Sequence, residues 1–411
     1  MNRNVLLLGL GMQGQAALYD LVNSGEIAHV VAADNRADLA ALLSHYPSEK
    51  VTGVPLDVSD EAGVERFMRQ ADIVVEALPA VVVLRIGQLA AKCGVPLVSS
   101  MFYLNPEGLD EGAVAAVKRE IRDLDLLAKE KGITILTEFG MDPGLDLVMA
   151  KKAVSELDEV HEFHTYGAGL PAPNARGNPL QYKFSWSPIG VMRAYKRQST
   201  IISGWQSVDV NEDAIFEPRY RHTIEVPEIG APMECFPNGD AVHYAELLGI
   251  RASLKESGRY TGRLPGHCAF WDTMVKSGFL DEQPVRVGEM LVSPREFTTA
   301  LLASQTQFQF GEGEQDMTFI RVDARGVHAG KKKRVVYQLI DLRDLKTGFT
   351  SMQRLVGFTM SLGARLILSG SFRKPGVLTG LDVPYESVLP PLEKHGIRAT
   401  RQEWPLCRER E

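Results

Sequence analysis

A short apolar run followed by a glycine-rich turn constrains this chain more than any other feature of its sequence. Residues 5–17 read VLLLGLGMQGQAA, so that glycines 9, 11 and 14 fit the spacing G-x-G-x-x-G. In this pattern Gly9 permits a tight turn, Gly11 lets a pyrophosphate approach the backbone, and Gly14 lets a helix pack closely on the strand. The segment therefore predicts a strand, a phosphate-binding turn and a helix whose free N–H groups bind a dinucleotide.

A second apolar run, Val30–Asp34, ends in an acid at the position where dinucleotide-binding folds recognise the ribose. Asp34 follows the glycines by roughly 20 residues, and a carboxylate there accepts hydrogen bonds from the ribose 2′-OH. The 2′-phosphate of NADP would meet its negative charge, although Arg36 is close enough to soften that repulsion. We therefore expect NAD as the cofactor in preference to NADP.

Strand-like and helix-like segments alternate throughout residues 3–137. Such alternation is typical of an α/β fold, here a Rossmann-type, doubly wound parallel sheet. We predict strands at Val5–Leu8, Val30–Asp34, Val51–Asp57, Ile73–Leu78, Pro96–Ser100 and Ile133–Thr137, with helices at Ala16–Ser24, Ala37–Tyr46, Glu61–Gln70 and Leu84–Cys93 and a longer one that ends at Lys131.

Ligands of such sheets bind beyond the carboxyl ends of the strands, which places the cofactor in a predictable crevice. The residues at those ends are the predicted cofactor-binding set: Gly9, Gly11, Met12, Gln13, Gly14, Asp34, Asn35, Arg36, Asp57, Val58, Ala77, Leu78, Pro79, Ser99 and Ser100.

The pattern changes after residues 142–144, and the rest of the chain predicts a second, α+β domain. Its strand-like runs are Val160–Tyr166, Ala245–Gly249, Thr318–Asp323 and Arg334–Asp341. The last segment, with an apolar helix at Leu355–Leu368, a short run at Gly376–Leu378 and a helix at Glu386–Lys394, is expected to return to the first domain. We thus predict domains at 1–140 and 141–345, and a returning segment at 346–411.

Charge and composition exclude several classes of partner. A formal net charge of -7 disfavours nucleic acid and anionic membranes, and no run of 18 apolar residues predicts a membrane span. Four scattered cysteines without a C-x-x-C motif suit a reducing cytoplasm. His161 and His164 form H-x-x-H, but on a strand positions three apart face opposite sides, so we expect no metal site. The basic run 331–334 is expected at a solvated hairpin tip.

Three further segments resemble the saccharopine dehydrogenase family. Residues 138–146, EFGMDPGLD, are similar to its G-x-D-P-G-x-D segment, and residues 169–173 and 178–187 are similar to its glutamate-forming branch. The resemblance implies a pyridine-nucleotide-dependent enzyme that oxidises the C–N bond of a lysine-derived amino acid, whose imine takes up water and collapses to aldehyde and amine. It also implies that the second domain binds the substrate and forms a homodimer. The layout after residue 315 also resembles lysine 6-dehydrogenase, which is the first alternative. A non-catalytic dinucleotide sensor is the alternative from another class.

The same resemblance assigns candidate site residues. Asp142 would hold the substrate amine or relay protons, and Tyr103 would donate a hydrogen bond to a substrate carboxylate; these are the predicted catalytic residues. Asp142 could instead only open a turn, and Tyr103 could instead be packed core. The predicted substrate-binding residues are Gly169, Leu170, Lys183, Trp186 and Arg259.

The chain departs from the family pattern at two positions. Gly167 stands where the glutamate-forming enzymes have a cysteine, and Gly239 replaces the arginine of a P-N-R-D segment that binds a substrate carboxylate. A glycine cannot replace the charge-assisted, bidentate contact of a guanidinium. Arg259 is the nearest spare cation that could take over this contact.

Overall fold

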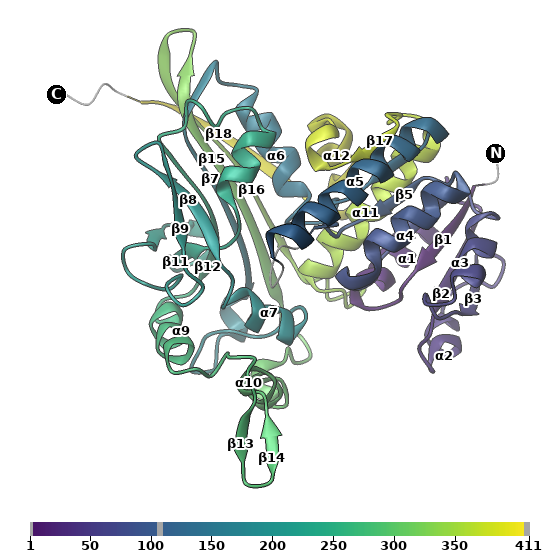
Figure 1. The fold of residues 1–411 in the computed structure, drawn as a ribbon, viewed down its shortest axis with the longest axis horizontal. Helices are drawn as coiled ribbons and strands as arrows, with labels where there is room; N and C mark the ends of the chain where they lie inside the picture. The colour runs from purple at the N-terminus through teal and green to yellow at the C-terminus, as the bar shows by residue number, and fades with distance from the viewer. Residues whose placement is uncertain (1–2, 105–109, 407–411) are drawn as a thin grey trace. The chain divides into compact units, whose positions relative to one another are not determined.

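The computed structural model describes residues 3–104 and 110–406, and these divide into two compact units. The first unit comprises Met1–Val148 and Gln353–Gly396, and the second comprises Met149–Met352 and Ile397–Glu411. Each unit is built around its own sheet (Figure 1). Within the described residues, no helix is long and apolar enough to cross a membrane.

The first unit contains a seven-stranded parallel sheet in the order β17-β6-β5-β4-β1-β2-β3, as the alternation of residues 3–137 predicts. The strand order reverses between β1 and β4, which is where doubly wound sheets bind ligands. Its strands are β1 (Asn4–Leu8), β2 (His29–Asp34), β3 (Val51–Pro55), β4 (Ile73–Glu76), β5 (Leu97–Ser99), β6 (Thr134–Leu136) and β17 (Gly376–Leu378).

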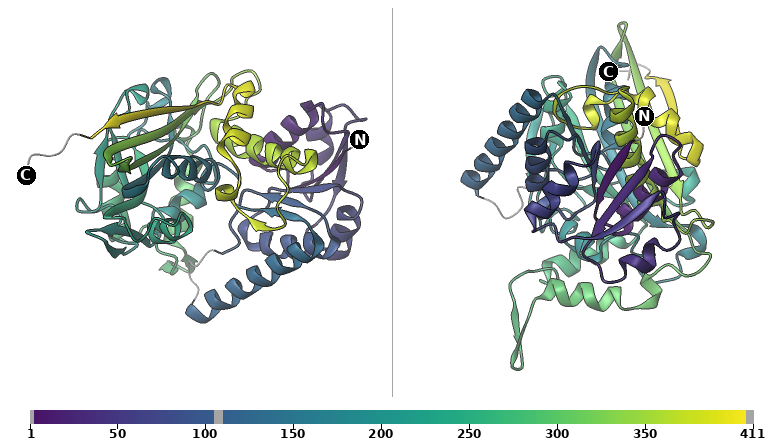
Figure 2. Two further views of the ribbon diagram at one scale, coloured as in Figure 1. Left: turned by 90° about the horizontal axis from the view of Figure 1, so that it is seen from above. Right: turned by 90° about the vertical axis from the view of Figure 1, so that its right-hand side faces the viewer.

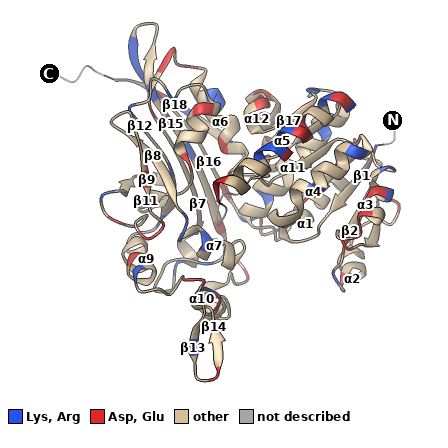
Figure 3. Cartoon of the chain, viewed as in Figure 1, with Lys and Arg blue, Asp and Glu red and all other residues tan. Residues whose placement is uncertain are grey.

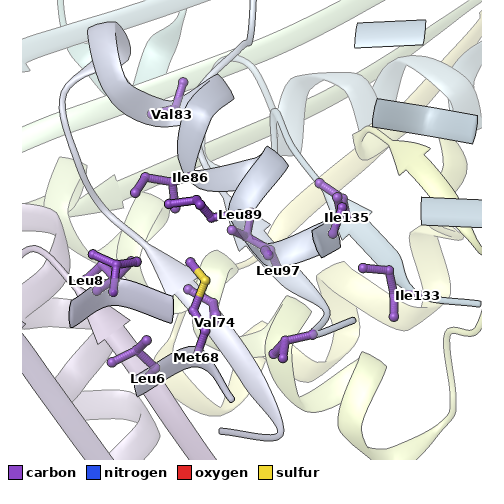
Figure 4. Close-up of a cluster of buried hydrophobic side chains, with 14 of the residues drawn as sticks. Leu6, Leu8, Met68, Val74, Val83, Ile86, Leu89, Leu97, Ile133 and Ile135 are labelled. Atoms are coloured by element: carbon purple, nitrogen blue, oxygen red, sulfur yellow. The ribbon is translucent and has the colours of Figure 1, made fainter. Parts of the chain in front are cut away.

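Helices cover both faces of this sheet. They are α1 (Met12–Asn23), α2 (Leu39–Leu43), α3 (Glu61–Met68), α4 (Ala80–Cys93), α5 (Glu111–Lys131), α11 (Ser351–Ser369) and α12 (Tyr385–Leu392). Helix α6 (Leu145–Val154) and the start of α11 cross the boundary between the units, and most of α6 belongs to the second unit. Residues of α3, α4 and α5 form one buried cluster with alternate residues of β1, β4, β5 and β6 (Figure 4). Burial of this apolar area contributes about 25 cal/mol per Å² to folding.

Helix α11 packs directly on α1. A Cβ atom added at Gly357 of α11 would lie 2.7 Å from the Cβ of Ala16, so only a glycine lets the helices approach this closely. The buried carboxylate of Asp20 in α1 accepts a hydrogen bond of 2.6 Å from Ser361 and pairs with Arg365 at 3.3 Å. A buried carboxylate needs such partners, so α11 completes the core of the first unit.

The second unit contains a nine-stranded mixed sheet with the path β10-β11-β12-β7-β15-β16-β18, extended by β8 and β9. The pair of β12 and β7 is parallel and the other neighbours are antiparallel. The strands are β7 (Glu159–Pro171), β8 (Ser199–Ser203), β9 (Gln206–Val210), β10 (His222–Ile224), β11 (Met233–Pro237), β12 (Glu256–Arg263), β15 (Asp316–His328), β16 (Lys331–Leu342) and β18 (Ala399–Pro405).

Among the described residues, four α-helices lie entirely in this unit, together with a separate hairpin: α7 (Pro188–Ala194), α8 (Ala241–Leu247), α9 (His267–Lys276), α10 (Pro294–Ala303), β13 (Val285–Val287) and β14 (Met290–Val292). The hairpin of β13 and β14 projects from the rest of the unit (Figures 1 and 2). Charged residues of both signs lie on the outer helices of each unit, for example along α5 and α9 (Figure 3).

Two predictions about these elements are corrected. The strand predicted at Ala245–Gly249 belongs mostly to helix α8, because Asp240 caps the helix by accepting hydrogen bonds from the N–H groups of Val242 and His243. The segment 346–411 returns to the first unit only in part, since β18 pairs with β16 at the edge of the second sheet.

Candidate functional site

The glycine turn has the geometry that its spacing predicts. Gly9 has a φ of +90°, and its N–H donates a hydrogen bond of 2.9 Å to the carbonyl of Ala33. A Cβ atom at Gly14 would lie 2.0 Å from the carbonyl oxygen of Gly9, whereas one at Gly11 would meet no described atom within 4 Å. Helix α1 follows without a side-chain cap among the described residues. Open backbone at Gly11 beside an uncapped helix N-terminus fits a dinucleotide pyrophosphate.

The carboxylate of Asp34, at the end of β2, stabilises this turn through hydrogen bonds. Its Oδ2 accepts a hydrogen bond of 2.5 Å from the N–H of Leu10, and its Oδ1 accepts one of 2.8 Å from the N–H of Arg36. A ribose hydroxyl at this position would therefore meet a carboxylate whose orientation is already determined by two backbone groups. Asp34 thus has a structural contact beside its predicted role in cofactor binding.

The guanidinium of Arg36 lies over the same turn. Its Nη1 donates a hydrogen bond of 2.7 Å to the carbonyl of Leu10. Its Nε and Nη2 donate to the two carboxylate oxygens of Asp38 at 2.6 and 2.8 Å. Asp38 thus neutralises much of the positive charge that Arg36 could offer to a 2′-phosphate.

The other predicted cofactor residues lie at the same end of the sheet, because each follows or completes a parallel strand at its carboxyl end. Met12 and Gln13 begin α1, Asn35 follows β2, Asp57 and Val58 follow β3, Ala77, Leu78 and Pro79 follow β4, and Ser99 and Ser100 lie at the end of β5. The structure therefore brings the whole predicted set to one edge of the first unit.

Glu76, the last residue of β4, is a residue of this edge that sequence analysis missed. Its side chain is fully buried, and its Oε1 accepts a hydrogen bond of 2.6 Å from the N–H of Leu78. Burial raises the pKa of Glu76 to about 7, although interactions with Ser99 and the Leu78 N–H favour the charged form. The signal in the sequence is an acid inside the apolar run 73–78.

Two acids of the segment 138–146 have different surroundings. Asp142 is exposed, in a loop whose Gly140 approaches the Ser100 side chain so closely that a Cβ at Gly140 would lie 2.9 Å away. Asp146 is buried in the first turn of α6, where its Oδ1 accepts a hydrogen bond of 2.8 Å from the N–H of Gly144. Asp142 is therefore accessible to a ligand at the end of β5, whereas Asp146 stabilises the turn.

Tyr103 does not fit the predicted catalytic role. Its side chain is buried in the core formed with α4 and α5, and a Cβ at Gly87 would lie 2.4 Å from its hydroxyl oxygen. That hydroxyl has no hydrogen-bond partner among the described residues, and burial raises its pKa far above the ordinary value. A neutral phenol packed against a helix favours the alternative that Tyr103 is packed core, and its catalytic role stays a prediction.

Arg259 lies beside Gly239, the glycine that stands in place of the arginine of the P-N-R-D pattern. Gly239 has a φ of +112°, and a Cβ there would lie 3.5 Å from Nε of Arg259. The guanidinium of Arg259 is mostly buried and lies 4.1 Å above the ring of Tyr244. The cation of β12 thus lies beside Gly239, and its contact with a substrate carboxylate stays a prediction.

Polar groups accompany Arg259 on this face of the second sheet. Asn238 donates a hydrogen bond of 2.6 Å from Nδ2 to the hydroxyl of Thr261, which shares a face of β12 with Arg259. The Oδ1 atom of Asn238 is buried and has no hydrogen-bond partner among the described residues. A buried amide oxygen without a partner is costly, and a polar ligand would satisfy it.

The remaining predicted substrate residues have structural partners. Lys183 is buried and donates a hydrogen bond of 2.6 Å to Glu314, so its charge is compensated within the chain. The ring of Trp186 would lie 2.5 Å from a Cβ at Gly190, which places it against the first turn of α7. Leu170 is buried in a hydrophobic cluster, whereas Gly169 is its neighbour on the opposite face of β7. These contacts favour structural roles for Lys183, Trp186 and Leu170.

The fold, together with the residues at the carboxyl end of the first sheet, defines the class of protein. It is a dinucleotide-binding oxidoreductase with a separate mixed-sheet domain. Residues 5–136 match the family model of the saccharopine dehydrogenase NADP binding domain, and residues 140–397 match that of the saccharopine dehydrogenase C-terminal domain. The chain therefore belongs to the saccharopine dehydrogenase family, and a nicotinamide dinucleotide is its cofactor.

Named relatives agree with this assignment. The chain is 27% identical to alpha-aminoadipic semialdehyde synthase of Arabidopsis thaliana over 85% of its own length, and it spans 38% of that protein. It is 26% identical to saccharopine dehydrogenase [NADP(+), L-glutamate-forming] of Schizosaccharomyces pombe over 96% of this chain and 98% of that one. The apo saccharopine dehydrogenase (L-Glu forming) of Saccharomyces cerevisiae has the same fold, with a TM-score of 0.82, 22% identity and coverage of 98% and 100%. These names do not favour lysine 6-dehydrogenase.

Proposed function

We propose that this protein oxidises the secondary amine of saccharopine and releases glutamate and aminoadipate semialdehyde. The single observation that carries the proposal is the group formed by Arg259, Asn238 and Thr261 beside Gly239, in a chain with both domains of the family. Saccharopine carries several carboxylates, and a mostly buried guanidinium is suited to bind one of them. Free lysine has a single carboxylate and its ε-amine is primary.

The residues at the edge of the first sheet fit a nicotinamide dinucleotide, with Gly11 and the start of α1 at the pyrophosphate and Asp34 at the ribose. When bound, this group accepts the hydride that leaves the carbon beside the substrate nitrogen. The chain must then bind the substrate and move protons. Arg259 would hold a carboxylate of the substrate. Asp142, exposed in the loop that contacts Ser100, would exchange protons with the nitrogen as water adds and the amine departs.

The choice between NAD and NADP depends on the charge near the ribose. The family description and the names of the relatives favour NADP. The residues of this chain favour NAD, because Asp34 places a carboxylate at the 2′ position and Asp38 already pairs with Arg36. We propose NAD on this basis.

The homodimer and the cytoplasmic location expected from the sequence stay predictions.

The direct test mixes the full-length protein with saccharopine and either NAD or NADP, and follows both the absorbance of the reduced nicotinamide and the release of glutamate. We expect turnover with saccharopine, no turnover with lysine, and a higher kcat/KM for NAD. Asp34→Ala should reduce the preference for NAD. Faster oxidation of lysine would refute the substrate, and a preference of the unmodified protein for NADP would refute the cofactor choice. Cofactor binding without turnover of any amine would support the sensor alternative instead.

A further inference from the structure

A cavity of 470 Å³ lies on one face of the large sheet of the second unit. This volume is within the usual range of small-molecule sites. Its lining residues come from β7, β12, β15 and β16 and from β10 with the residue after it: His164, Tyr166, His222, Thr223, Ile224, Glu225, Tyr260, Arg321, Asp323, Arg325 and Arg334.

This cavity is separate from the group proposed to bind substrate. Tyr260 lines the cavity, whereas its neighbours Arg259 and Thr261 point to the opposite face, because successive residues of a strand alternate between faces. The register agrees, since Arg321 of β15 lies opposite Tyr166 and Asp323 lies opposite His164. The two faces of one sheet thus carry two different polar groups.

Aromatic rings form one wall of the cavity. Tyr166 and Tyr260 stack with ring centroids 5.5 Å apart, and His222 contacts Tyr260 edge to face at 4.5 Å. The Tyr260 ring lies over Gly258, where a Cβ atom would come within 2.3 Å of it, so a larger residue would displace the ring. The wall therefore consists of aromatic rings that a planar ligand could contact.

Two of the three arginines that line the cavity have carboxylate partners. Arg334 forms a bidentate pair with Asp323, and Arg325 pairs with Glu162 at 3.0 Å. Arg321 donates to the neutral amide oxygen of Gln338 at 3.0 and 2.5 Å, and no carboxylate of the described residues lies within 4.0 Å of it. The carboxylates of Asp323 and Glu228 act on Arg321 from a greater distance. Because the hydrogen-bond partner of Arg321 among the described residues is uncharged, its guanidinium favours an oxyanion as an additional partner.

The histidines add neutral polar groups rather than charge. The Nδ1 atom of His164 is buried and has no hydrogen-bond partner among the described residues. Burial lowers the pKa of His164 to about 4 and also lowers that of His222, so both rings are neutral near neutral pH. Within the described residues, no three His, Cys, Asp or Glu side chains are grouped so that they could hold a metal ion.

We propose that this cavity binds a small organic oxyanion, a carboxylate or phosphate attached to a planar body, with Arg321 as its anchor and the Tyr166–Tyr260 wall against its body. Two ion-paired arginines shape the far side, and the exposed carboxylate of Glu225 lies at the rim. The ligand would be distinct from the substrate and the cofactor.

The test measures binding of benzoate and of phenyl phosphate to the full-length protein by isothermal titration calorimetry, with the two probes separating a carboxylate from a phosphate ligand. Arg321→Gln should lower the affinity for the more tightly bound probe by about 10-fold or more, since hydrogen bonds to charged groups contribute about 1.5–3 kcal/mol. The matched control is Arg286→Gln, which removes an exposed arginine from β13 and should leave the affinity unchanged. The rate of saccharopine oxidation should not change in either variant.

A second variant keeps the proposal testable if Arg321→Gln disturbs the strand. Glu225→Gln removes a negative charge from the exposed rim and should tighten binding of the same probe. Equal affinity of the unmodified protein and Arg321→Gln, no binding of either probe, or weaker binding in Glu225→Gln would overturn the proposal. A change from dimer to monomer in Arg321→Gln would overturn it as well, because the face would then be an interface between two copies of this chain.

Discussion

Glu76→Gln should make the first unit more stable at neutral and alkaline pH but not at acid pH. The fully buried carboxyl of Glu76 has a pKa of about 7, raised by burial from its ordinary value of 4.5. Between these two values the folded state holds one proton more than the unfolded state, so that the free energy of unfolding falls as the pH rises. A glutamine is neutral at every pH and removes this loss.

The expected size follows from the shift. One pKa unit corresponds to about 1.36 kcal/mol, so the stability of Glu76→Gln relative to the unmodified protein should rise by about 3 kcal/mol between about pH 4.5 and about pH 8. For a domain of 150–250 residues this is a relative increase in Tm of about 6–12 °C.

Differential scanning calorimetry of both proteins across this pH range gives the measurement. The comparison cancels the titration of the buried histidines, which both proteins share, and any constant effect of the amide appears as a pH-independent offset. Glu49→Gln, an exposed glutamate of the same unit, is the matched control and should show no such slope. A difference between Glu76→Gln and the unmodified protein that stays constant with pH would refute the reasoning.

The remaining predictions concern ligands. Gly14→Ala should lower Tm because its Cβ meets the backbone of Gly9, whereas Gly11→Ala should keep Tm and raise the KM of the cofactor, and equal effects in both assays would contradict this. Asp142→Asn should keep Tm and lower kcat by about 10²–10⁴-fold, whereas Asp146→Asn should mainly lower Tm; the reverse result would transfer the proton role to Asp146. Arg259→Gln should raise the KM of saccharopine by about 10-fold or more, and a normal KM would exclude its carboxylate contact.

Local patterns predict most of the first unit. The glycine turn, Asp34 and the alternation of strands and helices depend on residues that are close in sequence, and the structure reproduces them. The helix at 241–247 was missed because its signal is the cap residue Asp240, which follows a strand-like run. At this position the capping residue, and not the hydrophobic pattern, determines that the segment forms a helix.

The site residues were harder to predict, because their roles depend on partners that are distant in sequence. Lys183 is neutralised by Glu314, more than a hundred residues later, so the sequence cannot show that its charge is already paired. The ring of Tyr103 packs against helix α4 at Gly87, where the absence of a side chain leaves room for its hydroxyl. Nothing in the local motif indicates this direction of the ring. Arg259 could be proposed from the sequence because the absence of an arginine at Gly239 left a chemical requirement that another cation would have to meet, and its role stays a prediction.

The interleaved chain path has a consequence for the order of assembly during synthesis. The last strand of the parallel sheet, β17, is made only after most of the second unit, and β16 stays an open edge until β18 has been made. An unpaired edge strand is a template for aggregation. Neither unit can therefore be completed from one continuous stretch of the chain. A chain that stops between residues 378 and 399 would finish the first sheet but leave β16 exposed as it leaves the ribosome.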